Sequence, residues 1–259
     1  MRKSNFKLLY LGIFIILMQN SLVAADKNGN THLGLLNKTD GKNNYIVGTF
    51  NKTEGNKNNI AGASNKTEGN KNNITGASNK TKGDENKIVG SFNNTTGNNN
   101  AIGGASQKTV GNSNNVLGTL QDTEGDNNTI AGISQVTKGN NNIVGGASQT
   151  TTGNNNVIAG ATNKTIGDKN NITGISNKTE GTSNKILGNT NSITGDSNNI
   201  KGISNTLVGN KNAVLGLNNS IEGNRNGVLG FDNKTKGDLN LIAGLKNETT
   251  GDKNLVLGS

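Results

Sequence analysis

Residues 55–68 read GNKNNIAGASNKTE, and this stretch of two heptads contains the pattern that decides the fold. Each heptad begins with glycine, and glycine recurs at every seventh position from Gly34 to Gly258, which makes 33 glycines in phase. In all 32 complete heptads the third residue after the glycine is Asn or Gln, and the fifth is Ile, Val, Thr or Leu. Strict periodicity over most of a chain is typical of a solenoid.

Alternate heptads differ, so the true period is 14 residues. In the A heptads, of which Gly55 begins one, the fifth residue after the glycine is always Ile or Val. In the B heptads it is Thr in 13 of 16 cases, with Ile193, Leu207 and Ile221 as the exceptions. We therefore predict an all-β fold, a parallel β-solenoid of about 16 coils over residues 34–259, with two short strands in each coil.

Charged residues are confined to particular columns of the repeat. Side chains alternate between the two faces of a strand, so the third and fifth residues after each glycine share a face with the next glycine, and no charge occurs in these columns. Charges gather instead at the fourth and sixth residues of the B heptads, as in Lys38, Asp40, Lys52, Glu54, Lys66, Glu68, Lys80 and Lys82. The uncharged columns are thus expected to point inward, with the Asn amides bonded from coil to coil in a ladder.

The first 25 residues are of a different kind. Arg2, Lys3 and Lys7 precede an apolar run over residues 8–18, and the small residues Val23, Ala24 and Ala25 follow. This order predicts a secretory signal peptide over residues 1–25, which would make the mature protein extracellular. Residues 26–33 are predicted to form an N-terminal cap or linker. The apolar run is too short to span a bilayer, so no membrane insertion is expected.

The composition offers little material for catalysis. Cysteine is absent, and the single histidine, His32, is expected to be an exposed residue of the N-terminal cap with no triad around it. Aspartates follow in-phase glycines at Asp84, Asp126, Asp168, Asp196, Asp238 and Asp252, and we interpret them as solvated turn residues, because calcium-binding rolls use a nonapeptide repeat. We therefore expect no enzyme, no cofactor and no metal site.

We do not expect this chain to bind nucleic acid. The formal charge is +9, but three positive residues and no acid lie in the first 25 residues, which leaves +6 on the rest. The lysines alternate with glutamates, and aromatic residues for base stacking are scarce. Glycosylation sequons begin at Asn51, Asn65 and Asn163, but these residues occupy the inward column, so few sequons are expected to carry sugar.

The outward sixth position of the A heptads forms an uncharged stripe. It reads Val47, Ala61, Thr75, Val89, Gly103, Leu117, Ala131, Gly145, Ala159, Thr173, Leu187, Lys201, Leu215, Leu229, Ala243 and Leu257, with one charge in sixteen. A stripe of this kind either marks a binding face or is covered by another copy of the same chain.

Written from its other end, the heptad is x-x-N-x-[I/V/T]-x-G, and it resembles the x-x-N-x-V-x-G repeats of the grass ice-recrystallisation-inhibition antifreeze proteins over residues 34–258. The resemblance implies a left-handed β-roll with Asn ladders, to which Asn44, Asn58 and Asn72 correspond, and a core of Ile46, Ile60 and Ile74. It also implies an ice-binding face on the A strands, formed by Asn59, Ala61, Asn73, Thr75, Val89, Thr129, Ala131, Ala159, Asn171 and Thr173. The chain departs from the family pattern at Lys87, Lys185 and Lys201, which lie on the same face.

A weaker resemblance connects the repeat to the heads of trimeric autotransporter adhesins, in which an outward apolar stripe packs chains together. It implies self-association through Leu215, Leu229, Leu241, Leu255 and Leu257, and an uncapped C-terminal coil is also expected to pair with another copy. The sequence thus favours a secreted protein that binds ice or another extended surface. An adhesin-like or structural surface protein that self-associates is the alternative.

Overall fold

The computed structural model describes residues 24–258, which form strands and turns without a helix. The predicted signal peptide lies outside the described residues apart from Ala24 and Ala25. The chain divides into two compact units at residues 119 and 120. We call the described parts unit 1, residues 24–119, and unit 2, residues 120–258.

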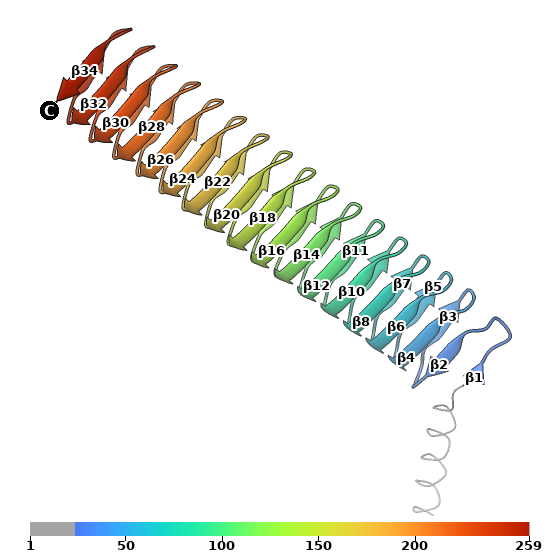
Figure 1. The fold of residues 1–259 in the computed structure, drawn as a ribbon. Helices are drawn as coiled ribbons and strands as arrows, with labels where there is room; N and C mark the ends of the chain where they lie inside the picture. The colour runs from blue at the N-terminus through green and yellow to red at the C-terminus, as the bar shows by residue number, and fades with distance from the viewer. Residues whose placement is uncertain (1–23, 259) are drawn as a thin grey trace, which may run out of the picture. The chain divides into compact units, whose positions relative to one another are not determined.

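Both units are parallel β-solenoids in which two kinds of strand alternate (Figure 1). The A strands of unit 1 are β2 (Thr31–Leu33), β4 (Tyr45–Thr49), β6 (Asn59–Ala63), β8 (Asn73–Ala77), β10 (Lys87–Ser91), β12 (Ala101–Ala105) and β14 (Asn115–Thr119). Its B strands are β3 (Lys38–Asp40), β5 (Lys52–Glu54), β7 (Lys66–Glu68), β9 (Lys80–Lys82), β11 (Asn94–Thr96) and β13 (Lys108–Val110).

Unit 2 repeats this arrangement. Its A strands are β16 (Thr129–Ile133), β18 (Ile143–Ala147), β20 (Val157–Ala161), β22 (Asn171–Ile175), β24 (Lys185–Asn189), β26 (Asn199–Ile203), β28 (Ala213–Leu217), β30 (Gly227–Phe231), β32 (Leu241–Leu245) and β34 (Leu255–Gly258). Its B strands are β15 (Asp122–Glu124), β17 (Val136–Lys138), β19 (Thr150–Thr152), β21 (Lys164–Ile166), β23 (Lys178–Glu180), β25 (Ser192–Thr194), β27 (Thr206–Val208), β29 (Ser220–Glu222), β31 (Lys234–Lys236) and β33 (Glu248–Thr250).

Within each unit, the A strands and the B strands pair in parallel with the strand of the same kind in the next coil, in a register of 14 residues. Ile60 of β6 faces Ile74 of β8, and Leu215 of β28 faces Leu229 of β30. The A strands and the B strands form two separate sheets. The predicted fold class, a parallel β-solenoid of about 16 turns with two strands per turn, is confirmed.

The interior consists of the columns that the charge pattern predicted. The Ile and Val side chains at the fifth position of the A heptads, from Ile46 to Ile242, are at most 3% exposed. Thr67 and its equivalents fill the B side of the core, where many of their buried hydroxyls lack a hydrogen-bond partner. The core is therefore a narrow layer between the two sheets, aliphatic on one side and largely threonine on the other.

The buried Asn amides bond to one another from coil to coil, as Asn58 shows. The Asn58 side-chain Nδ2 donates to Asn44 Oδ1 in the preceding coil at 3.1 Å and to the Gly69 carbonyl oxygen at 2.7 Å. The Asn58 backbone N–H donates to the same Asn44 Oδ1 at 2.9 Å. Because an amide oxygen accepts two bonds and an amide nitrogen donates two, the buried side chain has all its partners.

The alternation predicted that the glycines face the interior, and this prediction is wrong. Gly76 has φ +133°, which only glycine adopts readily, and a Cβ there would lie 1.8 Å from the carbonyl oxygen of Gly90 in the next coil. The space that a side chain would need is thus occupied by the neighbouring coil rather than by the opposite sheet. The glycine column permits close stacking of successive coils and is half-buried.

The N-terminal coil differs from the prediction at His32. His32 is half-buried, occupies the core column opposite Ile46, and has its Nε2 2.8 Å from the Thr39 hydroxyl, whereas an exposed residue was expected. The Asp26 carboxylate begins the ladder by accepting bonds from the Asn30 side chain and backbone and from the Asn28 N–H. These bonds, those from Asn30 above all, lower the pKa of Asp26.

Candidate functional site

The outward side of the A strands, here called the A face, is the candidate site in each unit. Apart from β2 and β34, the A strands are five residues long because they continue through the glycine, as in Asn59–Ala63. The A face is therefore three columns wide, formed by the fourth and sixth residues of the A heptad and the first residue of the following B heptad.

The alternation of side chains in the sequence did not predict the third column of the A face. This column consists of Thr49, Ala63, Ala77, Ser91, Ala105, Thr119, Ile133, Ala147, Ala161, Ile175, Asn189, Ile203, Leu217, Phe231 and Leu245. None of these residues is charged, whereas the same position in the A heptads is mostly Asn or Asp. That difference between the two kinds of heptad was the signal that could have revealed the column.

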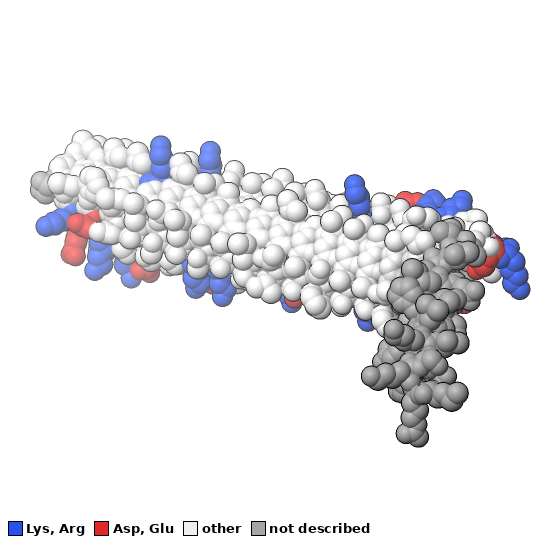
Figure 2. Space-filling view, turned by 90° about the horizontal axis from the view of Figure 1, so that it is seen from below, with Lys and Arg blue, Asp and Glu red and all other residues white. Residues whose placement is uncertain are grey.

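Charge separates the A face from the B face. Over the described residues 45–257, the three columns of the A face contain only Lys87, Lys185 and Lys201 as charged residues. The B strands instead expose ion pairs such as Lys52–Glu54, with 2.6 Å between Nζ and Oε1, and Lys66–Glu68 at 2.7 Å. Figure 2 shows charged side chains gathered toward the margins of the view, with uncharged residues between them.

All ten residues predicted for ice binding lie on A strands, and nine are exposed while Ala61 is half-buried. In unit 1, the paired strands β6, β8 and β10 bring together Asn59, Ala61, Asn73, Thr75 and Val89.

In unit 2, β20 and β22 bring Ala159 beside Asn171 and Thr173. Thr129 and Ala131 on β16 are separated from that group by β18, which presents Ile143 and Gly145. The structure therefore places the ten residues on the same kind of face but in three groups rather than in one.

An outer ladder holds the corner beside the A face. The Asn56 backbone N–H donates to Asn70 Oδ1 in the following coil at 2.9 Å, and the Asn154 N–H donates to Asp168 Oδ1 at 2.6 Å. This direction is opposite to that of the inner ladder, in which each residue donates to the preceding coil. The inner ladders of the A and B heptads and the outer ladder, which runs in the opposite direction, thus fix the spacing of the coils.

The aspartates after the glycines are members of this outer ladder, so they do more than occupy turns. Asp196 Oδ1 accepts bonds from the backbone N–H and the hydroxyl of Thr182, and these bonds, the backbone one first, lower the pKa of Asp196. Within residues 24–258, His, Asp and Glu side chains do not gather in a group suited to a metal ion.

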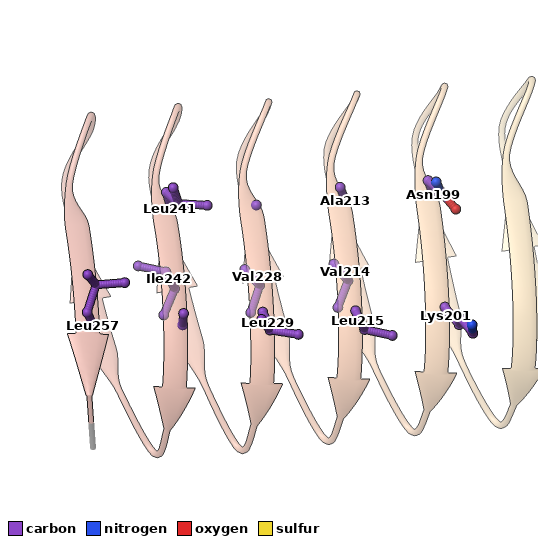
Figure 3. Close-up of a pocket in the computed structure, with 12 residues that line it drawn as sticks. Asn199, Lys201, Ala213, Val214, Leu215, Val228, Leu229, Leu241, Ile242 and Leu257 are labelled. Carbon is purple, nitrogen blue, oxygen red and sulfur yellow. The ribbon is translucent and has the colours of Figure 1, made fainter.

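The C-terminal part of unit 2 has a different A face, which we call the leucine patch: Leu215, Leu217, Leu229, Phe231, Leu241, Leu245, Leu255 and Leu257. The five leucines predicted for self-association are 48–71% exposed. Between them lies an apolar hollow at Ala213 and Gly227 (Figure 3). Leu241 fills part of it, since a Cβ on Gly227 would lie 2.9 Å from its Cδ1.

Comparison with known families supports the resemblance. Residues 173–258 match the family model of the grass antifreeze beta roll, and the resemblance of the repeats to that family is thereby confirmed over this span. The matched span begins at Thr173, a predicted ice-binding residue, and includes the leucine patch. No curated protein matches the chain. In the described part of the chain, no helix is long and apolar enough to cross a bilayer.

Proposed function

We propose that this protein is secreted, acts by binding rather than by catalysis, and binds ice through its A face, which slows the recrystallisation of ice. The match to the grass antifreeze beta roll supports this function for the scaffold. The observation that carries the proposal for the site is the width of the face: three columns of small or uncharged residues repeat from strand to strand in strict register.

The physical basis is a regular surface that orders water. Parallel strands place equivalent side chains about 4.8 Å apart between coils, and alternate residues of one strand about 6.8 Å apart. Amide, hydroxyl and methyl groups at Asn73, Thr75 and Ala77 therefore form a grid of fixed dimensions. The Asn ladders hold this grid without bulky or flexible side chains, so little conformational entropy is lost when it meets a crystal surface.

Lys87 and Lys185 set the limits of the face under this proposal. A hydrated ammonium group projects from β10 and from β24, and it would disturb ordered water around it. The strongest candidates for contact with ice are thus β6 and β8 in unit 1 and β16 to β22 in unit 2, which include most of the ten predicted residues.

The test is the growth of ice grains in a frozen solution of the purified protein. Thr75→Lys combined with Thr173→Lys is expected to abolish inhibition, because each substitution adds a charge to a flat group of strands. Thr96→Lys combined with Thr152→Lys is the matched control, since these threonines are equally outward but lie on B strands. Circular dichroism of both variants checks that the fold is intact.

Two results would refute the proposal. Grains that coarsen at the same rate with and without micromolar wild-type protein would exclude ice binding, and equal losses in the A-face and B-face variants would exclude the A face as the site. Secretion is tested separately: the N-terminus of the protein recovered outside the cell is expected at Asp26.

A structural or adhesive surface protein is a second candidate function. The leucine patch favours it, because exposed apolar clusters of this kind mark contacts between proteins. Ice binding and self-association use different coils, so one chain can perform both.

A further inference from the structure

We propose that the leucine patch forms a two-fold symmetric contact with a second copy of this chain, in which β30 lies opposite β32 and β28 lies opposite β34. In this arrangement the two-fold axis runs parallel to the strands and passes between β30 and β32. The order of the coils is then reversed in the partner, while each column of the A face remains above the same column. This proposal is independent of ice binding.

The heights of the side chains fit this register. Ala213 and Gly227 leave a hollow in the first column, part of which Leu241 of the same chain fills. The register places these two small residues opposite Leu255 and Leu241 of the second copy. In the second column, Leu229 faces the small Ala243. In the third column, Phe231 faces Leu245. Each protruding side chain in the first two columns thus has a smaller residue opposite it, apart from Leu215, which faces Leu257.

The charges on the corner that follows the A strands fit the same register. Asp232, two residues after Gly230, comes directly opposite Lys246, two residues after Gly244, and the two-fold axis makes this pair occur twice. Both side chains are exposed, so they are free to reach the second copy. Opposite charges at this margin favour the reversed alignment.

The corner that precedes the A strands is mixed in charge. Arg225 comes opposite Leu239, with Asp238 next to it, which adds a second attractive contact near the axis. Lys211 comes opposite Lys253, and the negative charge of the adjacent Asp252 reduces the repulsion. The attraction is therefore strongest at the two central coils, where the pairing of β30 with β32 is centred.

A second copy whose coils run in the same order would not bring these opposite charges together. If the coils of the second copy ran in the same order, each coil would oppose its own equivalent, and Lys201 would face Lys201 beside the patch. Like charges at close range oppose association, whereas complementary charges select one register among many that a regular apolar surface allows.

The periodicity of the patch favours a second copy over an unrelated partner. Its rows of side chains repeat with the spacing of the coils, and another solenoid of the same chain has the same spacing over the same number of strands. The four strands and their corners would bury roughly 900 Å² in total, which is near the lower limit for specific interfaces. We therefore expect a weak dimer with a dissociation constant on the order of 10 μM.

Sedimentation equilibrium of the purified protein over a range of concentrations tests the contact. Leu229→Lys is expected to weaken dimerisation at least about tenfold, because the lysine would be buried against Ala243. Lysine is compatible with this column of the fold, since Lys201 occupies it two coils earlier. Leu187→Lys is the matched control in the same column outside the contact, and it should leave dimerisation unchanged.

Cysteine crosslinking tests the register, since the natural chain has no cysteine. Leu215 and Leu257 lie three coils apart in one chain, roughly 14 Å at the spacing of parallel strands, which is too far for a bridge within the chain. Sheets that pack face to face lie about 10 Å apart, which is farther than a direct disulfide spans. Leu215→Cys combined with Leu257→Cys should therefore give a covalent dimer with a short bis-maleimide crosslinker. Leu215→Cys alone is the matched control and should stay uncrosslinked, because the reversed register places Leu257 opposite it. Thermal melting of each variant verifies the fold.

Three outcomes would overturn the proposal. The first is a wild-type protein that stays monomeric at concentrations well above the expected constant. The second is dimerisation that survives Leu229→Lys, which would place the contact elsewhere. The third is a Leu215→Cys variant that crosslinks as well as the double variant, which would reject the reversed register. A monomer that instead sediments with neutral lipid vesicles would assign the patch to a membrane surface.

Discussion

At the scale of the residue, a Gln side chain, which is one methylene group longer than Asn, interrupts the inner ladder of the B heptads. Gln135 and Gln149 occupy the inner column where most coils have Asn, and both are fully buried. The longer side chain of Gln135 turns back to donate to the carbonyl oxygens of Ala131 at 2.9 Å and Gly146 at 2.8 Å. Its Oε1, like that of Gln149, has no hydrogen-bond partner.

We therefore predict that Gln135→Asn combined with Gln149→Asn stabilises unit 2. The shorter amide at position 149 would donate to the amide oxygen at position 135, as Asn177 donates to Asn163 at 3.0 Å. The free energy of unfolding should rise by about 1–3 kcal/mol, the cost of a buried unpaired polar group. Denaturant titration measures the change. The reverse exchange, Asn142→Gln, is the control and should destabilise; a less stable double variant would contradict the prediction.

Acid should act on the outer ladder through Asp196. The bonds from Thr182 hold the folded pKa of Asp196 below its ordinary value near 3.8, so the folded state binds fewer protons than the unfolded state at acidic pH. The stabilisation is present above that ordinary value and is lost as the pH falls through the lower folded pKa.

Asp196→Asn tests this dependence, and Asn210 at the same position of the next coil shows that asparagine fits the column. We expect the variant to melt slightly below the wild type at pH 7 and level with it at about pH 2, because the protonated aspartate no longer accepts a charge-assisted bond. Melting curves across this range measure the difference. A gap of constant size would show that Asp196 does not contribute through its charge.

At the scale of the strand, the in-phase glycine is required by its neighbour in the next coil. Gly76→Ala would place a methyl group 1.8 Å from the Gly90 carbonyl oxygen at φ +133°. Gly145 lies on the A face outside the phase, and a Cβ there would meet nothing within 4 Å. We predict a loss of more than about 3 kcal/mol for Gly76→Ala and less than about 1 kcal/mol for Gly145→Ala, measured by thermal and denaturant unfolding. Equal losses would refute the role of coil stacking.

The sequence predicted the strands well because the burial pattern is simple. The columns of Asn58 and Ile60 contain no charge, whereas the columns of Lys66 and Glu68 contain many charges. Only one register therefore keeps all charged side chains in solvent. The pattern could not reveal the direction in which a glycine Cβ would point, because that depends on how closely coils stack. Nor did it distinguish Asn from Gln in the ladder, since both are amides and only the reach of the side chain differs.

The candidate site was predicted only in part, because alternation does not show where a strand ends. Alternation identified Thr75 and Ala61 as outward, but it gave no sign that the A strand continues through Gly62 to Ala63. The third column therefore stayed unrecognised, and with it the aromatic and aliphatic residues that it adds to the leucine patch. His32 was misplaced because the first coil begins before the first in-phase glycine, where its alignment with Ile46 is visible only in the register of the strands.

At the scale of the whole molecule, two faces of different chemistry depend on a period of 14 residues, although the interior would tolerate a period of seven. Deleting residues 139–152 removes one A and one B heptad and leaves every later strand on its original face. Deleting residues 139–145 removes only an A heptad, so the later B strands, with residues such as Lys164 and Lys178, continue the A face.

We predict that the 14-residue deletion keeps a cooperative thermal transition and inhibition of ice growth. The seven-residue deletion should lose inhibition and melt at lower temperature, because five-residue strands would then stack on three-residue strands and lysines would enter the uncharged face. Circular dichroism and grain growth measure both properties on the same samples. Equal behaviour of the two deletions would mean that the heptad alone is the functional unit, and that the difference between the faces has no part in what the protein binds.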